Sequence, residues 1–278
     1  MRTCVFAIGC SLLFVLTAAA PASAQYGVRR GSDRATGETY HVEIAGELWN
    51  PSPTITLSSE SLGILGTNID FVNTLGIEKT RFKQLKLVLR PAKKHKFRFE
   101  YTPMTYDATR TITESFVFNG QFFSVGLPVT TNLQWKSYRF AYEYDFLYRP
   151  RWFVGVVAEA KYTDIQATLS TSFAGFADTE FTHARAPIPA IGGIGRGYVT
   201  PNISITGEFT AFKLPDRAVN SNDYGGKFYD FDLYGTVNFN DYVGAQLGYR
   251  SFDVFYKVKQ DEGTLTLKGL YFGGVLRY

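Results

Sequence analysis

Apolar and polar residues alternate through long stretches of this chain from about residue 40 onward, and no other feature of the sequence constrains the fold as strongly. In the stretch 229–239, for example, Phe231 and Leu233 fall on one face and Asp232 falls on the other. A period of two is that of a β-strand whose two faces lie in different environments. The pattern predicts ten strands and no long helix, with the strands at 40–48, 84–90, 96–102, 137–146, 152–163, 187–199, 202–211, 229–239, 242–250 and 265–278.

The connections between these strands fall into two kinds. Those after the second, fourth, sixth and eighth strands are short and carry Pro, Asn or Asp, which favour tight turns: Pro91–Lys94, Arg149–Arg151, Thr200–Pro201 and Asn240–Asp241. The others are mostly long, near 50–80, 107–132, 169–186, 214–226 and 257–263. Short turns at one end and long loops at the other are typical of a transmembrane β-barrel with periplasmic turns and external loops. The sequence therefore predicts an all-β, antiparallel, up-and-down transmembrane barrel of about ten strands. Eight or twelve strands are left open, because 53–65 also alternates and the glycine-rich sixth strand at 187–199 has no clear register.

The composition agrees with this fold and excludes several others. Apolar residues make up 45% of the chain and aromatic residues 16%, whereas only 19% are charged, against about 25% in a soluble domain. These fractions exclude intrinsic disorder, collagen and a coiled coil. The net charge of +4 is too close to balance to indicate a nucleic-acid partner.

The N-terminal residues have the layout of a secretory signal peptide. Arg2 precedes an apolar stretch from Cys4 to Ala20, and the small residues Ala22–Ala24 follow it, which predicts cleavage before Gln25. The expected organisation is a signal peptide at 1–24, a short periplasmic segment at 25–38 and the barrel with long external loops at 39–278. Both cysteines lie in the signal peptide, so the exported chain is expected to have no disulfide and no cysteine-based metal site.

The last predicted strand carries a resemblance to a known class of proteins. Leu270, Phe272, Leu276 and Tyr278 share one face, and this strand resembles the closing strand of the single-chain outer-membrane β-barrels of Gram-negative bacteria, most closely the small OmpA or PagL type. That resemblance implies residence in the outer membrane, contact with its lipid and lipopolysaccharide, and a role for Tyr278 as an assembly signal for the barrel-assembly machinery. The family more often has Phe at this position.

A soluble lipocalin-like barrel is the alternative, because alternation alone does not say which face is outside. The export segment and the two lengths of connection favour the membrane. Small residues interleaved with charges on the polar face also favour it, because they suit a crowded lumen: Ala141, Thr236, Gly244 and Gly248.

Charged residues on the polar faces of the strands are expected to point into the lumen. They are Glu43, Glu47, Arg98, Glu100, Arg139, Glu143, Glu159, Lys161, Glu208, Asp232 and Arg250. Both signs occur at similar depth, which predicts a network of paired charges in a low-dielectric interior. The alternative is a narrow, gated path for ions or small solutes, with a modest cation preference.

The predicted barrel is compatible with three functions. The first is a structural or narrow porin-like barrel. The second is a surface-binding or adhesion barrel that acts through its external loops, where the aromatic residues of 116–123 flank an Asn119-Gly120 turn typical of a β-hairpin.

In the first loop, Asn68–Gly76 is expected to form a short capped helix that covers the lumen or its rim.

The third function, a hydrolase acting on lipid A or peptide, lacks its expected residues. The only histidines are His41, His95 and His183, and Glu180 precedes His183 without a helix to fix their geometry. A His-x-Ser or Asp-x-His pattern is absent, so no catalytic residue is expected. Asp230 and Asp232 have no further obvious ligands, and neither a metal nor a cofactor is expected.

Overall fold

The computed structural model describes residues 34–58, 66–118, 120–173, 176–214, 224–258 and 261–278. Residues 35–278 form one compact unit, and its main feature is a closed barrel of ten antiparallel strands. The barrel strands are β1 (Val42–Ser58), β3 (Phe82–Ala92), β4 (His95–Thr111), β7 (Pro128–Arg149), β8 (Trp152–Phe173), β9 (Phe176–Thr200), β10 (Ile203–Lys213), β11 (Tyr224–Asn238), β12 (Val243–Val258) and β13 (Asp261–Arg277).

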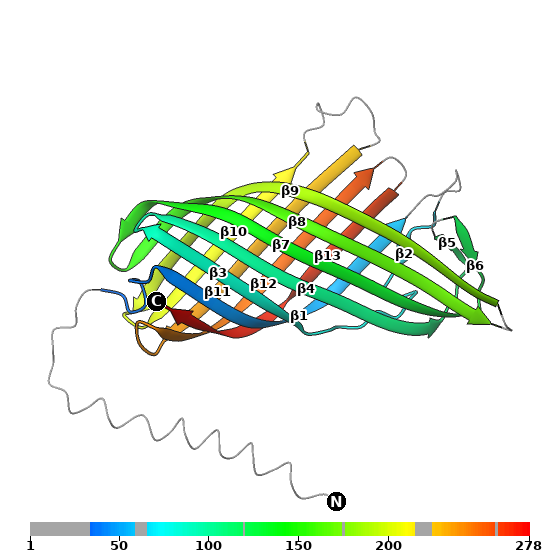
Figure 1. Ribbon diagram of the computed structural model, residues 1–278, viewed down its shortest axis with the longest axis horizontal. Helices are drawn as coiled ribbons and strands as arrows, with labels where there is room; N and C mark the ends of the chain where they lie inside the picture. Colours follow the sequence, from blue (N-terminus) through cyan, green and yellow to red (C-terminus); the bar gives the residue numbers. More distant parts are fainter. Residues whose placement is uncertain (1–33, 59–65, 119, 174–175, 215–223, 259–260) are drawn as a thin grey trace, which may run out of the picture. The chain divides into compact units, whose positions relative to one another are not determined.

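Each barrel strand pairs with its neighbours along the chain, and the ring closes between the first and last strands. The closing ladder runs from Glu43 opposite Arg277 to Ser58 opposite Glu262. Figure 1 shows the strands crossing the barrel obliquely. The predicted all-β up-and-down barrel and its strand number of ten are confirmed, and each of the ten predicted segments overlaps a different barrel strand. Among the described residues no helix is long and apolar enough to cross a membrane.

The predicted faces hold in the half of the barrel nearest the short turns. Phe231 and Leu233 of β11 are exposed on the outside, whereas Asp230 and Asp232 are buried inside. On β8 the outward apolar residues extend from Trp152 to Tyr162, a height of about 25 Å for a tilted strand. That height and the aromatic residues at both ends are those of a lipid-facing band.

Beyond this band the inner and outer faces exchange their polarity. On β7, Arg139 points inward below the change, whereas Leu133 and Trp135 are the buried inward residues above it and Lys136 is exposed. The same exchange occurs on β12, where Phe252 lies inside next to Arg250. Above the band the barrel has an apolar interior and a polar exterior. We call this part the external segment; among the residues whose side chains the structure describes, it comprises 52–58, 103–111, 128–137, 163–171, 251–257 and 261–268.

Several strands are longer than predicted because of the external segment. The expected loop at 169–186 is wrong: β8 and β9 continue as a paired ladder up to Phe173 opposite Phe176. The expected loop at 257–263 shrinks in the same way, since Val258 already faces Asp261. The alternating residues at 53–58 belong to β1, which lengthens that strand without adding another to the barrel.

Of the three remaining predicted loops, 214–226 lies mostly outside the described residues, and the described parts of 50–80 and 107–132 fold into the mouth of the external segment. The predicted hairpin is confirmed as β5 (Phe116–Phe118) and β6 (Gln121–Phe123), and Gly120 has the positive φ of 82° that the two-residue turn needs. Phe118 and Phe123 are buried, whereas Phe122 is exposed. Figure 1 places this hairpin at the end of the barrel opposite the C-terminus.

The first loop contributes a short strand, β2 (Ile69–Asp70), and one turn. The expected helix over 68–76 is reduced to this single turn, in which Asp70 Oδ1 accepts hydrogen bonds from the backbone N–H groups of Val72 and Asn73, both at 2.9 Å. Gly76 ends the turn with a φ of 76°. Phe71 and Leu75 are fully buried in the same apolar cluster as Phe118, so the turn fills the mouth.

Candidate functional site: the lumen

The lumen of the lipid-facing half is filled by charged side chains. Among the described residues, nine cationic side chains lie within ion-pair distance of ten carboxylates there. The structure places all the residues expected in the lumen within this set: Glu43, Glu47, Arg98, Glu100, Arg139, Glu143, Glu159, Lys161, Glu208, Asp232 and Arg250.

Eight further members are not among the residues expected in the lumen. They are Glu38, Lys86, Arg90, Lys96, Asp145, Arg196, Asp230 and Arg277. Arg277 lies between the outward residues Leu276 and Tyr278, so the alternation of the strand alone would have placed its side chain in the lumen. Arg196 lies in a glycine-rich stretch without a clear alternation, and Glu38 precedes the first strand, so neither had such a signal.

A chain of ion pairs runs through the middle of the lumen. Arg98 lies 2.6 Å from Glu143 and 3.1 Å from Glu208. Arg139 pairs with Glu208 and lies 2.5 Å from Glu159. Every one of these side chains is buried or nearly so, and the pairs compensate charges that would otherwise be costly to remove from water.

At the upper end of the chain, Arg250 holds Asp230 with two hydrogen bonds of 2.7 and 3.0 Å and also contacts Glu100. Lys161 contacts the same Asp230, and its ammonium lies 4.3 Å from the centre of the Phe228 ring. Lys161 therefore joins the polar part of the lumen to the apolar core above it, through an ion pair on one side and a cation–π contact on the other.

A second group of ion pairs surrounds Lys86. Its Nζ lies 3.0 Å from Glu47 and 3.2 Å from Asp232, and the hydroxyl of Tyr271 donates to Asp232 at 2.7 Å. The Tyr271 ring fits because residue 248 is glycine, since a Cβ there would lie 2.5 Å from a ring carbon. Gly248, one of the predicted small residues of the polar face, thus makes room for a large inward side chain.

Residues 35–40 close the short-turn end of the lumen. The backbone N–H of Thr36 donates to Pro201 O at 2.8 Å. Glu38 Oε1 accepts a hydrogen bond from Arg196 Nη1 at 2.8 Å, and Glu38 Oε2 lies 3.5 Å from Arg90. Burial raises the pKa of Glu38, but the charges of Arg196, Lys96 and Arg90 outweigh burial, so the pKa lies below its ordinary value.

The mouth of the external segment contains an apolar core. Ile55, Leu133, Trp135, Phe252 and Leu267 are among the strand residues buried there. The loop residues Phe71, Leu75, Phe118 and Phe123 complete the same cluster. The barrel is therefore filled at its mouth by apolar side chains and along its lipid-facing half by ion pairs.

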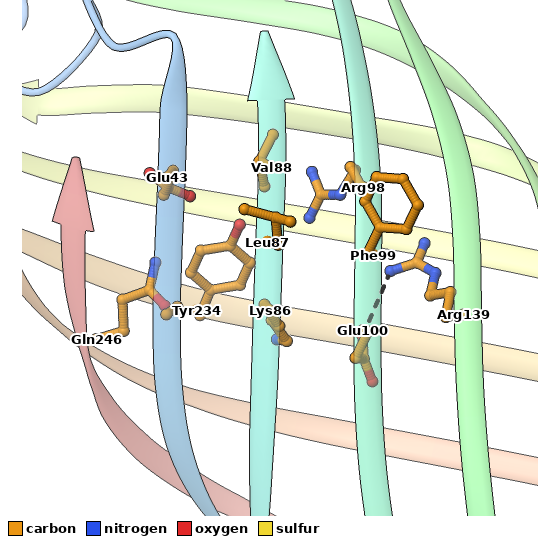
Figure 2. Close-up of a pocket in the computed structure, with 11 residues that line it drawn as sticks. Glu43, Lys86, Leu87, Val88, Arg98, Phe99, Glu100, Arg139, Tyr234 and Gln246 are labelled. Carbon is orange, nitrogen blue, oxygen red and sulfur yellow. Dashed lines mark ion pairs between the residues drawn. The ribbon is translucent and has the colours of Figure 1, made fainter. Parts of the chain in front are cut away.

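A small cavity remains between the ion pairs, and Figure 2 shows the residues around it. Its volume is about 20 Å³, which is room for about one water molecule. Lys86, Arg98, Glu100 and Arg139 line it together with Tyr234. The polar lining suits a water that bridges these groups.

The structure describes the side chains of two of the three histidines, His41 and His95. His41 is exposed. His95 Nδ1 lies 2.6 Å from the Tyr142 hydroxyl beside the first short turn, and the side chains of Glu180 and His183 lie outside the described part. Asp230 forms ion pairs with Lys161 and Arg250, and Asp232 forms one with Lys86. Among the described residues, no group of three or more His, Cys, Asp or Glu side chains could hold a metal ion.

An apolar outer band about 25 Å high around a charged, filled interior defines a transmembrane β-barrel. The barrel is similar in fold to the outer membrane protease OmpT from Escherichia coli, with a TM-score of 0.57, 10% sequence identity and coverage of 85% of this chain and 96% of that chain. The protein thus has the fold of the Gram-negative outer-membrane β-barrels.

Two other solved barrels align over most of the chain with lower scores. The translocator domain of the autotransporter NalP from Neisseria meningitidis has a TM-score of 0.44 and 8% identity, and the alignment covers 98% of this chain and 96% of that chain. Ail, the attachment invasion locus protein of Yersinia pestis, has a TM-score of 0.35 and 8% identity, with 86% and 99% covered. No protein-family profile and no curated protein matches the chain.

Proposed function

We propose that the protein is a closed, non-conducting outer-membrane barrel that works at the cell surface through its external segment. The observation that carries this proposal is the exchange of polarity between the two faces above the lipid band. It gives the external segment an apolar core and a polar wall, which is the arrangement of a water-soluble barrel. Strand β8 extends this wall roughly 25 Å past the lipid-facing band.

The filling of the lumen supports closure over conduction. A narrow path for ions would have to pass the core around Phe71 and Phe118 and then the ion pairs of Arg98, Arg139 and Arg250. Breaking one partner away from a buried pair costs about 3–5 kcal/mol, so a conducting state would need several such costs at once.

Planar-bilayer recording tests closure directly. The purified full-length barrel should give no current steps above background at high salt, whereas an open porin inserted by the same procedure gives steps. Reproducible single-channel steps from this protein would reject the non-conducting barrel and favour the narrow channel.

The wall of the external segment supports a binding role. Asn132 Nδ2 donates to Asp107 Oδ1 at 2.5 Å, Gln134 Nε2 donates to Asn132 Oδ1 at 3.0 Å, and the hydroxyls of Thr109 and Thr130 lie 3.0 Å apart. These side chains are held by one another on a paired sheet, so a ligand would find them already ordered and would lose less entropy on binding. Hydroxyl and amide groups of this kind suit a polar ligand such as a carbohydrate.

Bacteria that display the protein can be tested on a glycan array. The wild type should bind a subset of glycans, and the pair Asn132→Ala with Gln134→Ala should lose that binding. The pair Asp253→Ala with Thr266→Ala is the matched control, because these residues form a similar hydrogen bond of 2.6 Å on β12 and β13. Equal binding by both variants, or none by the wild type, would contradict a glycan-binding role for the β4–β7 part of this wall.

A further inference from the structure

An open groove of about 450 Å³ crosses the lipid-facing side of the barrel just below the external segment. Its upper row crosses five neighbouring strands in register: Leu85, Tyr101, Tyr138, Tyr162 and Pro187. This volume is within the range of ligand pockets. Glu100, Arg139 and Lys161 also border the groove, but their side chains are buried in the lumen, so the surface that the groove exposes is almost entirely aromatic and aliphatic. Only hydrocarbon would be favourable there, because polar groups would lose their hydrogen bonds to water.

Rings form the walls of the groove and a small residue forms its floor. The Tyr101 and Tyr138 rings stack at 4.9 Å between centres, and Tyr162 follows at 6.3 Å. In the next row down, Phe140 of β7 lies opposite Ala160 of β8. The missing bulk at Ala160, with rings beside and above it, leaves a channel suited to a flexible chain.

Two lysines stand immediately above the groove, at the depth of lipid headgroups. Lys83 and Lys136 are exposed and lie two residues beyond Leu85 and Tyr138 on the same outward faces of β3 and β7. Pro103 of β4 lies opposite Lys136, and β4 is the one strand between β3 and β7, so the backbones of Lys83 and Lys136 lie about 10 Å apart. Asp164 of β8 faces Lys136 from the other side.

We infer that this groove holds one acyl chain of a lipid whose headgroup carries phosphate, with the phosphate held between Lys83 and Lys136. Charge-assisted hydrogen bonds from two ammonium groups can neutralise a phosphate, and each basic side chain at a membrane surface strengthens binding of an anionic lipid. The inference goes beyond the proposed function, because it concerns the wall inside the membrane and not the external segment.

Native mass spectrometry of the full-length protein in detergent tests this site, with bisphosphorylated lipid A as the probe. The wild type should retain one molecule of bisphosphorylated lipid A. Dephosphorylated lipid A should bind with an affinity that is about fivefold lower for each lysine contact that the missing phosphate removes. Lys136→Ser should weaken binding by a similar factor. Lys227→Ser is the control, because Lys227 lies two residues beyond the outward Tyr229 on β11, away from the groove.

The apolar part of the site has its own pair of variants. Ala160→Trp should fill the groove and remove the bound lipid, whereas Ala158→Trp, one outward position nearer the short turns on β8, should leave binding unchanged. Equal retention by both tryptophan variants, or by both lysine variants, would overturn the site. Binding of inorganic phosphate as tight as that of lipid A, or a second protein copy in place of the lipid adduct, would also overturn it.

Discussion

Arg139 shows how a charged side chain becomes part of the core of a membrane protein. It is buried in the lumen, where it pairs with Glu159 and Glu208 and lies 3.7 Å from Glu100. The exposed strand face beside it carries Tyr138 and Phe140 to the lipid. The apolar surface and the ion pairs therefore stabilise opposite faces of the same strand.

Replacing Arg139 by Met should destabilise the barrel by about 3–5 kcal/mol, because Glu159 and Glu208 would keep their buried charge and lose their partner. Urea unfolding in lipid vesicles, followed by tryptophan fluorescence, measures the loss. Lys268→Met is the control: Lys268 lies 3.6 Å from Asp253 on the outer wall and is half exposed, so its loss should change the unfolding free energy by less than about 1 kcal/mol. Equal losses would show that the lumen pairs are no more stabilising than surface pairs.

Glu38 gives a prediction about pH at the short-turn end. Its pKa in the folded barrel is lowered, so the ionised form stabilises the fold above the unfolded-state pKa, about 4.3, and this contribution is lost as the pH falls through the folded-state pKa. Glu38→Gln should therefore lower the unfolding free energy more at pH 7 than at pH 3. An equal effect at both values would contradict a charge-based contribution.

At the scale of the strand, the exchange of polarity predicts how a charge is tolerated at different heights on one face. Leu247 and Ser251 both point outward from β12, the first in the lipid band and the second at its upper edge. Leu247→Arg should cost about 2–4 kcal/mol, whereas Ser251→Arg should cost about 0–1 kcal/mol. The comparison uses unfolding in vesicles, and equal costs would mean that the band does not end between these two residues.

The strands that cross the membrane were predictable because lipid and lumen impose opposite polarity on successive residues. The rule failed beyond the band, where Ile165 and Leu169 turn inward and Gln166 and Thr168 turn outward. The alternation continues there in the opposite phase, so a prediction that expects a single phase ends this strand near Tyr162. A search for such a phase change would have found the external segment. Contacts such as Glu38 with Arg196 could not be predicted, because 158 residues separate the partners and no local pattern links them.

At the scale of the whole molecule, the barrel wall and the filling of its mouth are separate sources of stability. The wall is a closed hydrogen-bonded ring, whereas the mouth depends on side chains such as Phe118 and Phe71. Phe118→Ala should therefore loosen the loops without opening the ring. Limited proteolysis of intact cells should cleave the variant within 112–127 faster than the wild type, while the membrane-embedded barrel stays folded and resistant. Loss of the whole barrel on the same treatment would contradict this separation.

The pairing of β1 with β13 also determines when folding can finish. Glu43 and Arg277 are joined by a 2.6 Å hydrogen bond across 234 residues of sequence, and contacts of such high contact order form slowly. Until β13 arrives, β1 and β13 each present a long unpaired edge, which is a template for pairing with another chain. The yield of folded barrel should therefore depend more on how long those two edges stay unpaired than on the free energy of unfolding of the finished barrel.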